Sequence, residues 1–296
     1  MEIQSKSNKE IFVSTTFFPD QSLLSDCLRV CKENKISNIE IGSNHRYQKD
    51  YSYISNYNFN YIVHNYFPVP KKKIIVNIAS VNDKIYEESI QHIKNSILFS
   101  KKIGSPLYTF HPGFLSDPRS ENNSNDNYDF VWTEKQKINN YDIAWQRMIK
   151  AINEIIQFSK INNIKVAFET EGSTTKSKFL LLQRPEEYEN IIKLYKPEEL
   201  GISLNIGHLN LARKSFRFSI KNFLNLIQNY VVAMELSHNN GVEDQHLPLL
   251  DKNCWYWDII IDKRFKKVKK ILEYRNIDIS QVTESIRLLE KKIYGI

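Results

Sequence analysis

The sequence predicts an α/β protein of the (β/α)8 TIM barrel class. Three observations lead to this prediction. Short apolar runs alternate with amphipathic runs of helical spacing, eight runs have the character of strands, and no linker divides the 296 residues. Short and mostly apolar strands are typical of a parallel sheet that is buried on both faces. Eight β/α units in a chain of slightly under 300 residues fit a closed barrel, so we expect one domain over residues 1–296.

The predicted strands are rich in β-branched and aromatic residues, which favour a pleated and buried surface. They cover residues 10–17, 36–43, 59–67, 106–113, 164–172, 200–208, 231–238 and 278–286. An open, doubly wound sheet is the alternative fold. It calls for a glycine-rich first turn, and the segment STTFFPDQ that follows the first strand contains no glycine.

The predicted helices repeat apolar residues every three or four positions. They cover residues 23–34, 86–104, 139–163, 184–195, 218–230, 262–276 and 287–296. Gly104 suits the end of one helix and Pro185 the first turn of another. One long polar insertion, at about residues 114–141, interrupts the alternation after the fourth strand. Within it, Phe130 and Trp132 are expected to pack locally or to reach a substrate.

Composition and charge narrow the class of protein. Hydrophobic residues make up 41% of the chain, and no apolar run is long enough for a membrane span. The first residues lack the apolar middle of a signal peptide. The three cysteines, Cys27, Cys31 and Cys254, form no disulfide framework, so we expect a cytoplasmic protein. A net charge of +7 suits an anionic partner, but the lysines are spread along the whole chain and form no local basic patch.

Polar residues of metal-ligand type lie at the carboxyl ends of the predicted strands. In a parallel barrel all these ends meet at one face, where active sites form. A carboxylate within an apolar strand is costly to bury without a partner. The candidate residues are His64, His111, Glu169, Asn205, His208, His238, Asp244, His246 and Glu284.

Imidazole and carboxylate ligands together suit Zn²⁺, Mn²⁺ or Fe²⁺. Such an ion polarises a carbonyl or hydroxyl oxygen and lowers the pKa of a bound water. We find no serine elbow, phosphate-binding glycine loop or dinucleotide fingerprint that competes with this interpretation. The sequence therefore predicts a divalent metal site, with Zn²⁺ or Mn²⁺ as the expected cofactor.

Several motifs in chain order resemble the xylose isomerase-like barrel superfamily, which includes endonuclease IV and the sugar or sugar-phosphate isomerases and epimerases. The similar segments are VHNYF, FHPG, FETEG, LNIGH, ELSHNNGVEDQH and VTES, and they span nearly the whole chain. The resemblance places all nine candidate residues at metal-ligand positions. It implies that Glu169 and Glu284 are the catalytic pair that moves a proton between adjacent carbons.

The sequence departs from the superfamily pattern in two places. Asn205 stands where the superfamily carries an aspartate, and only five residues separate His238 from Asp244, in a segment that is longer and more basic in endonuclease IV. The short segment favours a metal-dependent isomerase or epimerase acting on a sugar or sugar-derived small molecule, whereas Asn205 is the main argument for a barrel without activity. An endonuclease IV-like phosphodiesterase that acts at abasic DNA is the alternative, and a barrel that has lost catalysis and only binds is the second alternative.

Overall fold

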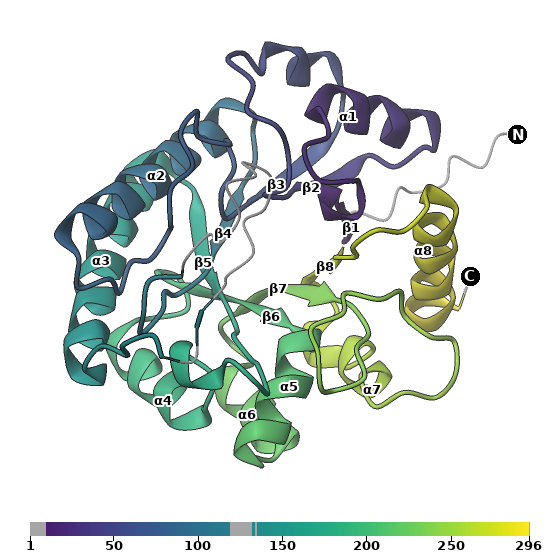
Figure 1. Ribbon diagram of the computed structural model, residues 1–296. Helices are drawn as coiled ribbons and strands as arrows, with labels where there is room; N and C mark the ends of the chain where they lie inside the picture. The colour runs from purple at the N-terminus through teal and green to yellow at the C-terminus, as the bar shows by residue number, and fades with distance from the viewer. Residues whose placement is uncertain (1–9, 119–131, 134, 296) are drawn as a thin grey trace, which may run out of the picture.

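The computed structural model describes residues 10–118, 132, 133 and 135–295, and its centre is a closed barrel of eight parallel strands. Each strand pairs with its neighbours in sequence order, and β1 pairs with β8 to close the barrel. Figure 1 shows the strands surrounded by helices. The strands are β1 Ile11–Ser14, β2 Asn38–Ile41, β3 Asn60–His64, β4 Leu107–Phe110, β5 Lys165–Glu169, β6 Gly201–Asn205, β7 Val231–Leu236 and β8 Lys269–Leu272. The predicted TIM barrel is therefore confirmed.

Helices of very different lengths cover the outside of the barrel. Among the described residues, none of them is long and apolar enough to cross a lipid bilayer. The helices are α1 Leu24–Glu33, α2 Asp83–Lys102, α3 Tyr141–Asn162, α4 Pro185–Leu194, α5 Ile206–Phe216, α6 Ile220–Ile227, α7 Trp257–Ile260 and α8 Ile279–Tyr294.

The barrel interior is built in layers. Side chains two positions apart on a strand point to the same face of the sheet. The residue two positions after an inward-facing apolar residue therefore also faces the barrel interior, closer to the carboxyl end of the strand. The lower layer is an apolar cluster of Phe12, Ile62, Leu107, Ala167, Ala233 and Ile271. Two residues later along the chain, at or just after the ends of these strands, stand Ser14, His64, Thr109, Glu169, Glu235 and Glu273, all of them buried. Three residues of this polar layer, His64, Glu169 and Glu273, line the cavity of the candidate site.

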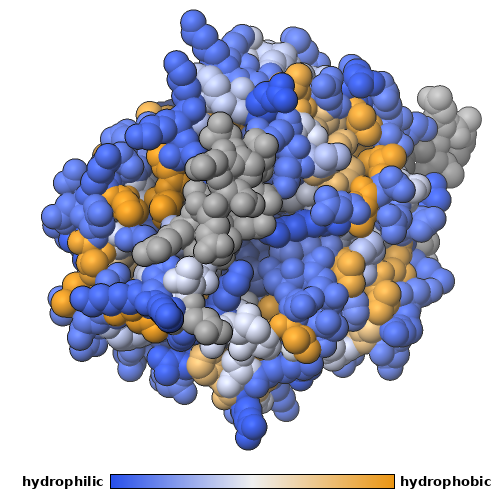
Figure 2. All heavy atoms as spheres, in the orientation of Figure 1, coloured by the Kyte–Doolittle hydropathy of each residue, from blue (hydrophilic) through white to orange (hydrophobic). Residues whose placement is uncertain are grey.

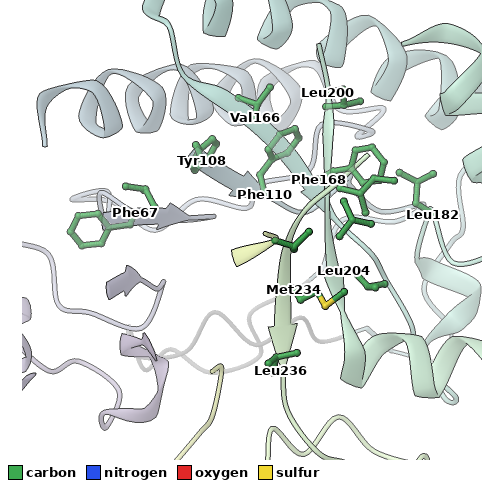
Figure 3. Close-up of a cluster of buried hydrophobic side chains, with 14 of the residues drawn as sticks. Phe67, Tyr108, Phe110, Val166, Phe168, Leu182, Leu200, Leu204, Met234 and Leu236 are labelled. Atoms are coloured by element: carbon green, nitrogen blue, oxygen red, sulfur yellow. The ribbon is translucent and has the colours of Figure 1, made fainter. Parts of the chain in front are cut away.

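The outward-facing strand residues form the main hydrophobic core, between the barrel and the helices. Figure 3 shows part of it, with aromatic residues of β4 and β5 beside aliphatic residues of β6 and β7. Tyr108, Phe110 and Phe168 are fully buried there. This apolar shell fixes the register of the strands and therefore the positions of the polar residues inside the barrel.

The sequence prediction for the eighth strand is wrong. Residues 278–286 lie at the start of α8 and not in a strand. Strand β8 is Lys269–Leu272, inside the segment that was predicted to be a helix. Glu284 therefore lies on an exposed helix surface, and Glu273 follows the eighth strand in its place.

The spacing of the buried residues explains why residues 278–286 begin a helix. The lysines of β8 explain why that strand was not predicted from the sequence. The buried residues Val282, Ser285 and Leu289 recur every three or four positions, as on one face of a helix. Four-residue β8 begins with two lysines, so it lacks the apolar run of a buried strand. Lys270 is nevertheless fully buried, and its ammonium donates to the carbonyl of Val268 over 2.8 Å.

Two further differences affect the candidate site. Helix α5 begins directly after β6, so His208 lies in the first turn of a helix and not at a strand end. In the polar insertion, the ring of Trp132 stacks on Phe179 with centroids 5.2 Å apart and also lines the cavity described below. Phe130 lies outside the described residues.

Candidate functional site

A cavity of about 580 Å³ opens at the carboxyl ends of the strands. Figure 2 shows hydrophilic residues around a hollow near the centre of this face of the molecule. The size is within the range of roughly 300–1,000 Å³ that is usual for small-molecule sites. Ten histidines and acidic residues line it, namely Asp20, His64, His111, Glu169, Glu171, His208, Glu243, Asp244, His246 and Glu273.

Strands β3, β4 and β5 bring together a first group of ligand-type residues, which we call the first triad: His64, His111 and Glu169. Their donor atoms lie within 4.8 Å of one another. Nε2 of His64 is 3.8 Å and Nδ1 of His111 is 3.6 Å from Oε2 of Glu169. Thr109, which pairs with His64 across the sheet, lies 2.9 Å from Nδ1 of that ring. Oε1 of Glu171 lies 2.7 Å from Nδ1 of His111 and orients the His111 ring.

The charges of the first triad follow from burial and from these contacts. Burial lowers the pKa of His64, and this outweighs the attraction of Glu169, so the imidazole is neutral and able to bind a metal. Burial also opposes protonation of His111, but Glu169 and Glu171 outweigh it and raise its pKa. Burial favours the neutral acid of Glu169, but the histidines around it hold its pKa well below the usual range.

The second triad is His208, Asp244 and His246, whose donor atoms also lie within 4.8 Å of one another. Oδ2 of Asp244 lies 3.2 Å from Nε2 of His208 and 2.9 Å from Nε2 of His246. Nδ1 of His208 lies 2.8 Å from the carbonyl oxygen of Thr170, so Nε2 is the nitrogen that faces the triad. Gly172 lets the β5 loop touch α5, because a Cβ there would overlap the carbonyl group of His208.

Ion pairing sets the charges of the second triad. Burial opposes protonation of both imidazoles, but Asp244 raises the pKa of His208 well above its usual value. Asp244 and Glu273 raise the pKa of His246 to about 9. Partial desolvation favours the neutral acid of Asp244, whose side chain is 32% exposed, but the two imidazoles hold its pKa well below the usual range. A metal ion at this triad therefore competes with protons.

Asn205 lies in the middle of three buried glutamates, which we call the carboxylate cluster: Glu169, Glu235 and Glu273. Its Nδ2 donates to Oε1 of Glu169 over 2.8 Å and to Oε2 of Glu235 over 3.1 Å. Oε2 of Glu273 is 3.4 Å away. Its Oδ1 accepts the backbone N–H of His208 over 3.0 Å and caps α5. The side chain was predicted to be a metal ligand, but its oxygen faces the helix and its N–H groups face the carboxylates.

Three buried glutamates inside the barrel strands or next to them were missed by the sequence analysis. Glu273 was hidden by the misassigned eighth strand. Glu40 and Glu235 are acidic residues within apolar strands, in NIEI and AMEL, so the argument that identified Glu169 applies to them as well. Burial, together with neighbouring carboxylates, raises the pKa of both well above the usual range. Glu40 is fully buried, and Ser14 is the hydroxyl that lowers its pKa against the effect of burial.

Two predicted site residues do not join the others. Glu284 lies on the exposed side of α8, because its segment is a helix. The backbone of His238 forms an isolated bridge with Leu247, and its ring packs on Tyr256 with centroids 5.9 Å apart. His238 is not among the residues that line the cavity. On β7 it is Glu235 that points into the barrel.

Both triads fit a divalent metal in donor chemistry. Each offers two imidazoles and one carboxylate, the donor set of many Zn²⁺ and Mn²⁺ sites. The rings of His64 and His208 are oriented through their other nitrogen by Thr109 and by the carbonyl oxygen of Thr170. Such supporting contacts are typical of histidines that bind metals.

Comparison with known proteins identifies related chains and related folds. A family model described as xylose isomerase-like TIM barrel matches residues 47–292. The uncharacterized protein MJ1311 of Methanocaldococcus jannaschii is 22% identical over 282 residues, which cover 94% of this chain and 87% of that protein. A solved structure described as a D-tagatose 3-epimerase-like protein is 19% identical, with a TM-score of 0.70 over 96% of this chain and 97% of that one. D-psicose 3-epimerase, solved in the presence of D-fructose, is 9% identical, with a TM-score of 0.66 over 97% of this chain and 100% of that one. At these identities the two solved structures indicate a shared fold.

Proposed function

This chain belongs to the xylose isomerase-like TIM barrel family, and from that premise we propose that it is a metal-dependent isomerase or epimerase of a sugar or a sugar-derived small molecule. The observation that carries the proposal is the cavity at the strand ends. It has the volume of a small-molecule site, and both triads and Glu273 line it. The names of the solved structures with the same fold, which are sugar epimerases, support the choice of substrate.

The two triads are the proposed metal sites. In the first, His64, His111 and Glu169 would hold the ion, and in the second, His208, Asp244 and His246 would hold it. A bound divalent ion supplies Lewis acidity, which polarises a carbonyl or hydroxyl oxygen of the substrate. Zn²⁺ and Mn²⁺ are the ions that these ligands suit best.

Glu169 and Glu273 are the proposed catalytic pair, so Glu273 takes the role that the sequence analysis gave to Glu284. Both line the cavity, on either side of the amide of Asn205. Burial favours the neutral acid of Glu273, but His246 outweighs it and lowers its pKa, so both glutamates are ionised at neutral pH and can accept a proton. One would remove a proton from the substrate carbon next to a carbonyl group. Return of a proton to the other face of that carbon gives epimerisation, and return to the neighbouring carbon gives isomerisation.

The test compares Glu273→Gln with Glu284→Gln. Both remove one negative charge, but Glu273 lines the cavity and Glu284 lies on the outside of α8. Metal-loaded protein is incubated with a panel of ketoses and aldoses in D₂O, and deuterium incorporation at carbon is measured by mass spectrometry. We expect exchange with wild type and Glu284→Gln, and a loss of at least about 100-fold in Glu273→Gln, the low end of what a general base contributes. No exchange by wild type with any sugar would overturn the proposal and favour a barrel that only binds.

A metal-dependent phosphodiesterase is the second candidate, because the second triad lies beside the first. A one-metal isomerase does not need His208, Asp244 and His246. Lys176 and Arg275 also line the cavity and could contact a phosphate. We expect only weak, salt-sensitive duplex binding and no incision of abasic DNA by the metal-loaded protein. Efficient incision would reverse the order of the two candidates.

A further inference from the structure

The carboxylate cluster gathers three carboxyl groups where water is excluded. Glu169, Glu235 and Glu273 come from β5, β7 and the end of β8, and at most 6% of each residue is exposed. Buried carboxylates that face one another need a proton, a hydrogen-bond donor or a cation between them. Three glutamates that converge in this way are an arrangement that suits an oxygen-bound metal ion.

An amide occupies the point where a cation would lie. Nδ2 of Asn205 is 2.8, 3.1 and 3.4 Å from the nearest carboxyl oxygens of Glu169, Glu235 and Glu273. Its two N–H groups face carboxyl oxygens from the ends of three other strands of the barrel. Asn205 adds no charge, and it reduces the repulsion between the ionised Glu169 and Glu273 through these hydrogen bonds.

The orientation of this amide is determined by its neighbours. Oδ1 accepts the backbone N–H of His208 over 3.0 Å, and the backbone N–H of Asn205 donates to Oγ1 of Thr170 over 2.9 Å. A reversed amide would turn its oxygen toward the glutamates and its N–H groups toward the N–H of His208. Both changes are repulsive, so the N–H groups must face the carboxylate cluster.

We propose that Asn205 replaces a metal ion at the centre of the carboxylate cluster, so that this chain binds one divalent ion in each triad and none at that centre. Asn205 is then a positioning residue: it holds Glu169 and Glu273 toward the cavity by hydrogen bonds. The inference rests on the proposed function, because it concerns the same cavity.

The experiment counts bound ions. Wild type, Asn205→Asp and Asn205→Ser are dialysed to equilibrium against Mn²⁺ and, separately, Zn²⁺, and the metal content is measured by mass spectrometry of the digested protein. Asn205→Asp supplies a fourth carboxylate where the amide was, and Asn205→Ser removes the amide while it still caps α5. We expect each variant to bind one more Mn²⁺ per chain than wild type, because an all-carboxylate site suits Mn²⁺ better than Zn²⁺.

Asn276→Asp is the matched control. Asn276 is exposed and lines the same cavity, so this substitution adds the same charge outside the carboxylate cluster, and the ion count should not change. Circular dichroism identifies a variant that has failed to fold. If one of Asn205→Asp and Asn205→Ser fails to fold, the ion count of the other tests the inference. Equal counts in wild type and a folded variant would overturn the inference, and so would three ions in wild type.

This inference and the proposed function fail in different ways. A gain of one ion in the variants, together with no deuterium exchange by wild type, would support the role of Asn205 and reject the isomerase. Deuterium exchange by wild type, together with equal ion counts in wild type and the variants, would support the isomerase and reject the role of Asn205.

Discussion

Oε1 of Glu169 lies 3.1 Å from Nδ1 of His208, so a carboxylate that belongs to the first triad also touches the second. The other oxygen of Glu169 faces His64 and His111. A change at this one residue should therefore affect both triads, although they are built from different strands and loops.

Glu169→Gln should reduce metal binding and abolish turnover without unfolding the protein. Glutamine has nearly the same shape, and its oxygen can still accept the N–H of Asn205, but it removes the charge that holds three histidines. Metal content and thermal melting, measured beside Glu284→Gln, test this. Wild-type metal content in Glu169→Gln would contradict the first triad as a metal site.

Thr109→Val should weaken metal binding through an indirect effect. The valine keeps the volume but loses the hydroxyl that lies 2.9 Å from Nδ1 of His64, so the ring is no longer held in one orientation. Loss of such a supporting contact typically costs about 10–100-fold in metal affinity. Competition with a chelator of known affinity measures it, and an unchanged affinity would show that Thr109 does not orient the ligand.

Gly172→Ala should disturb the second triad more than the first. A Cβ on residue 172 would overlap the backbone of His208, so the first turn of α5 must shift away from β5. Overpacking of this kind costs about 1–3 kcal/mol of stability. Metal titrations should show weaker binding at the second triad, or none, while binding at the first triad remains. Loss of binding at both triads in a folded variant would mean that the triads are not independent.

The metal-free protein should lose stability as the pH rises toward 9. Asp244 and Glu273 raise the folded-state pKa of His246 to about 9, although burial and Arg275 oppose this. The stabilising interaction is therefore complete below the unfolded pKa of about 6.5 and disappears as the pH rises through about 9. A shift of this size corresponds to something on the order of 3 kcal/mol.

Melting of metal-free wild type and His246→Gln from pH 5 to 10 tests this prediction. The difference in melting temperature should be largest near pH 6 and smallest above pH 9, because neutral glutamine keeps a polar group but carries no charge. A difference that does not vary with pH would mean that His246 is not protonated beside Asp244.

Metal binding at the second triad should release protons near neutral pH. His208 and His246 have raised pKa values, so each carries a proton that a metal ion must displace. Calorimetric titration with Zn²⁺ in two buffers of different ionisation enthalpy counts these protons. We expect more than one proton released per chain, and His246→Gln should release fewer.

The sequence by itself determined the barrel fold and most of the polar residues at the carboxyl ends of its strands. Alternation of apolar strands and amphipathic helices needs no tertiary information, because each period reflects local backbone geometry. His64, His111 and Glu169 could be recognised in the same way, since each stands at or next to the end of a clear apolar strand and lines the cavity.

Only the tertiary structure decided what occupies the centre of the site. Strand β8 is specified by its pairing with β1 and β7, and its lysines conceal it in the sequence, so Glu273 could not be told from a helical residue and Glu284 was chosen instead. The direction of the Asn205 amide depends on a backbone N–H of α5 and on carboxylates from three other strand ends. Spacing along a chain specifies which residues share a face, but closure of the barrel alone specifies which atoms meet across it.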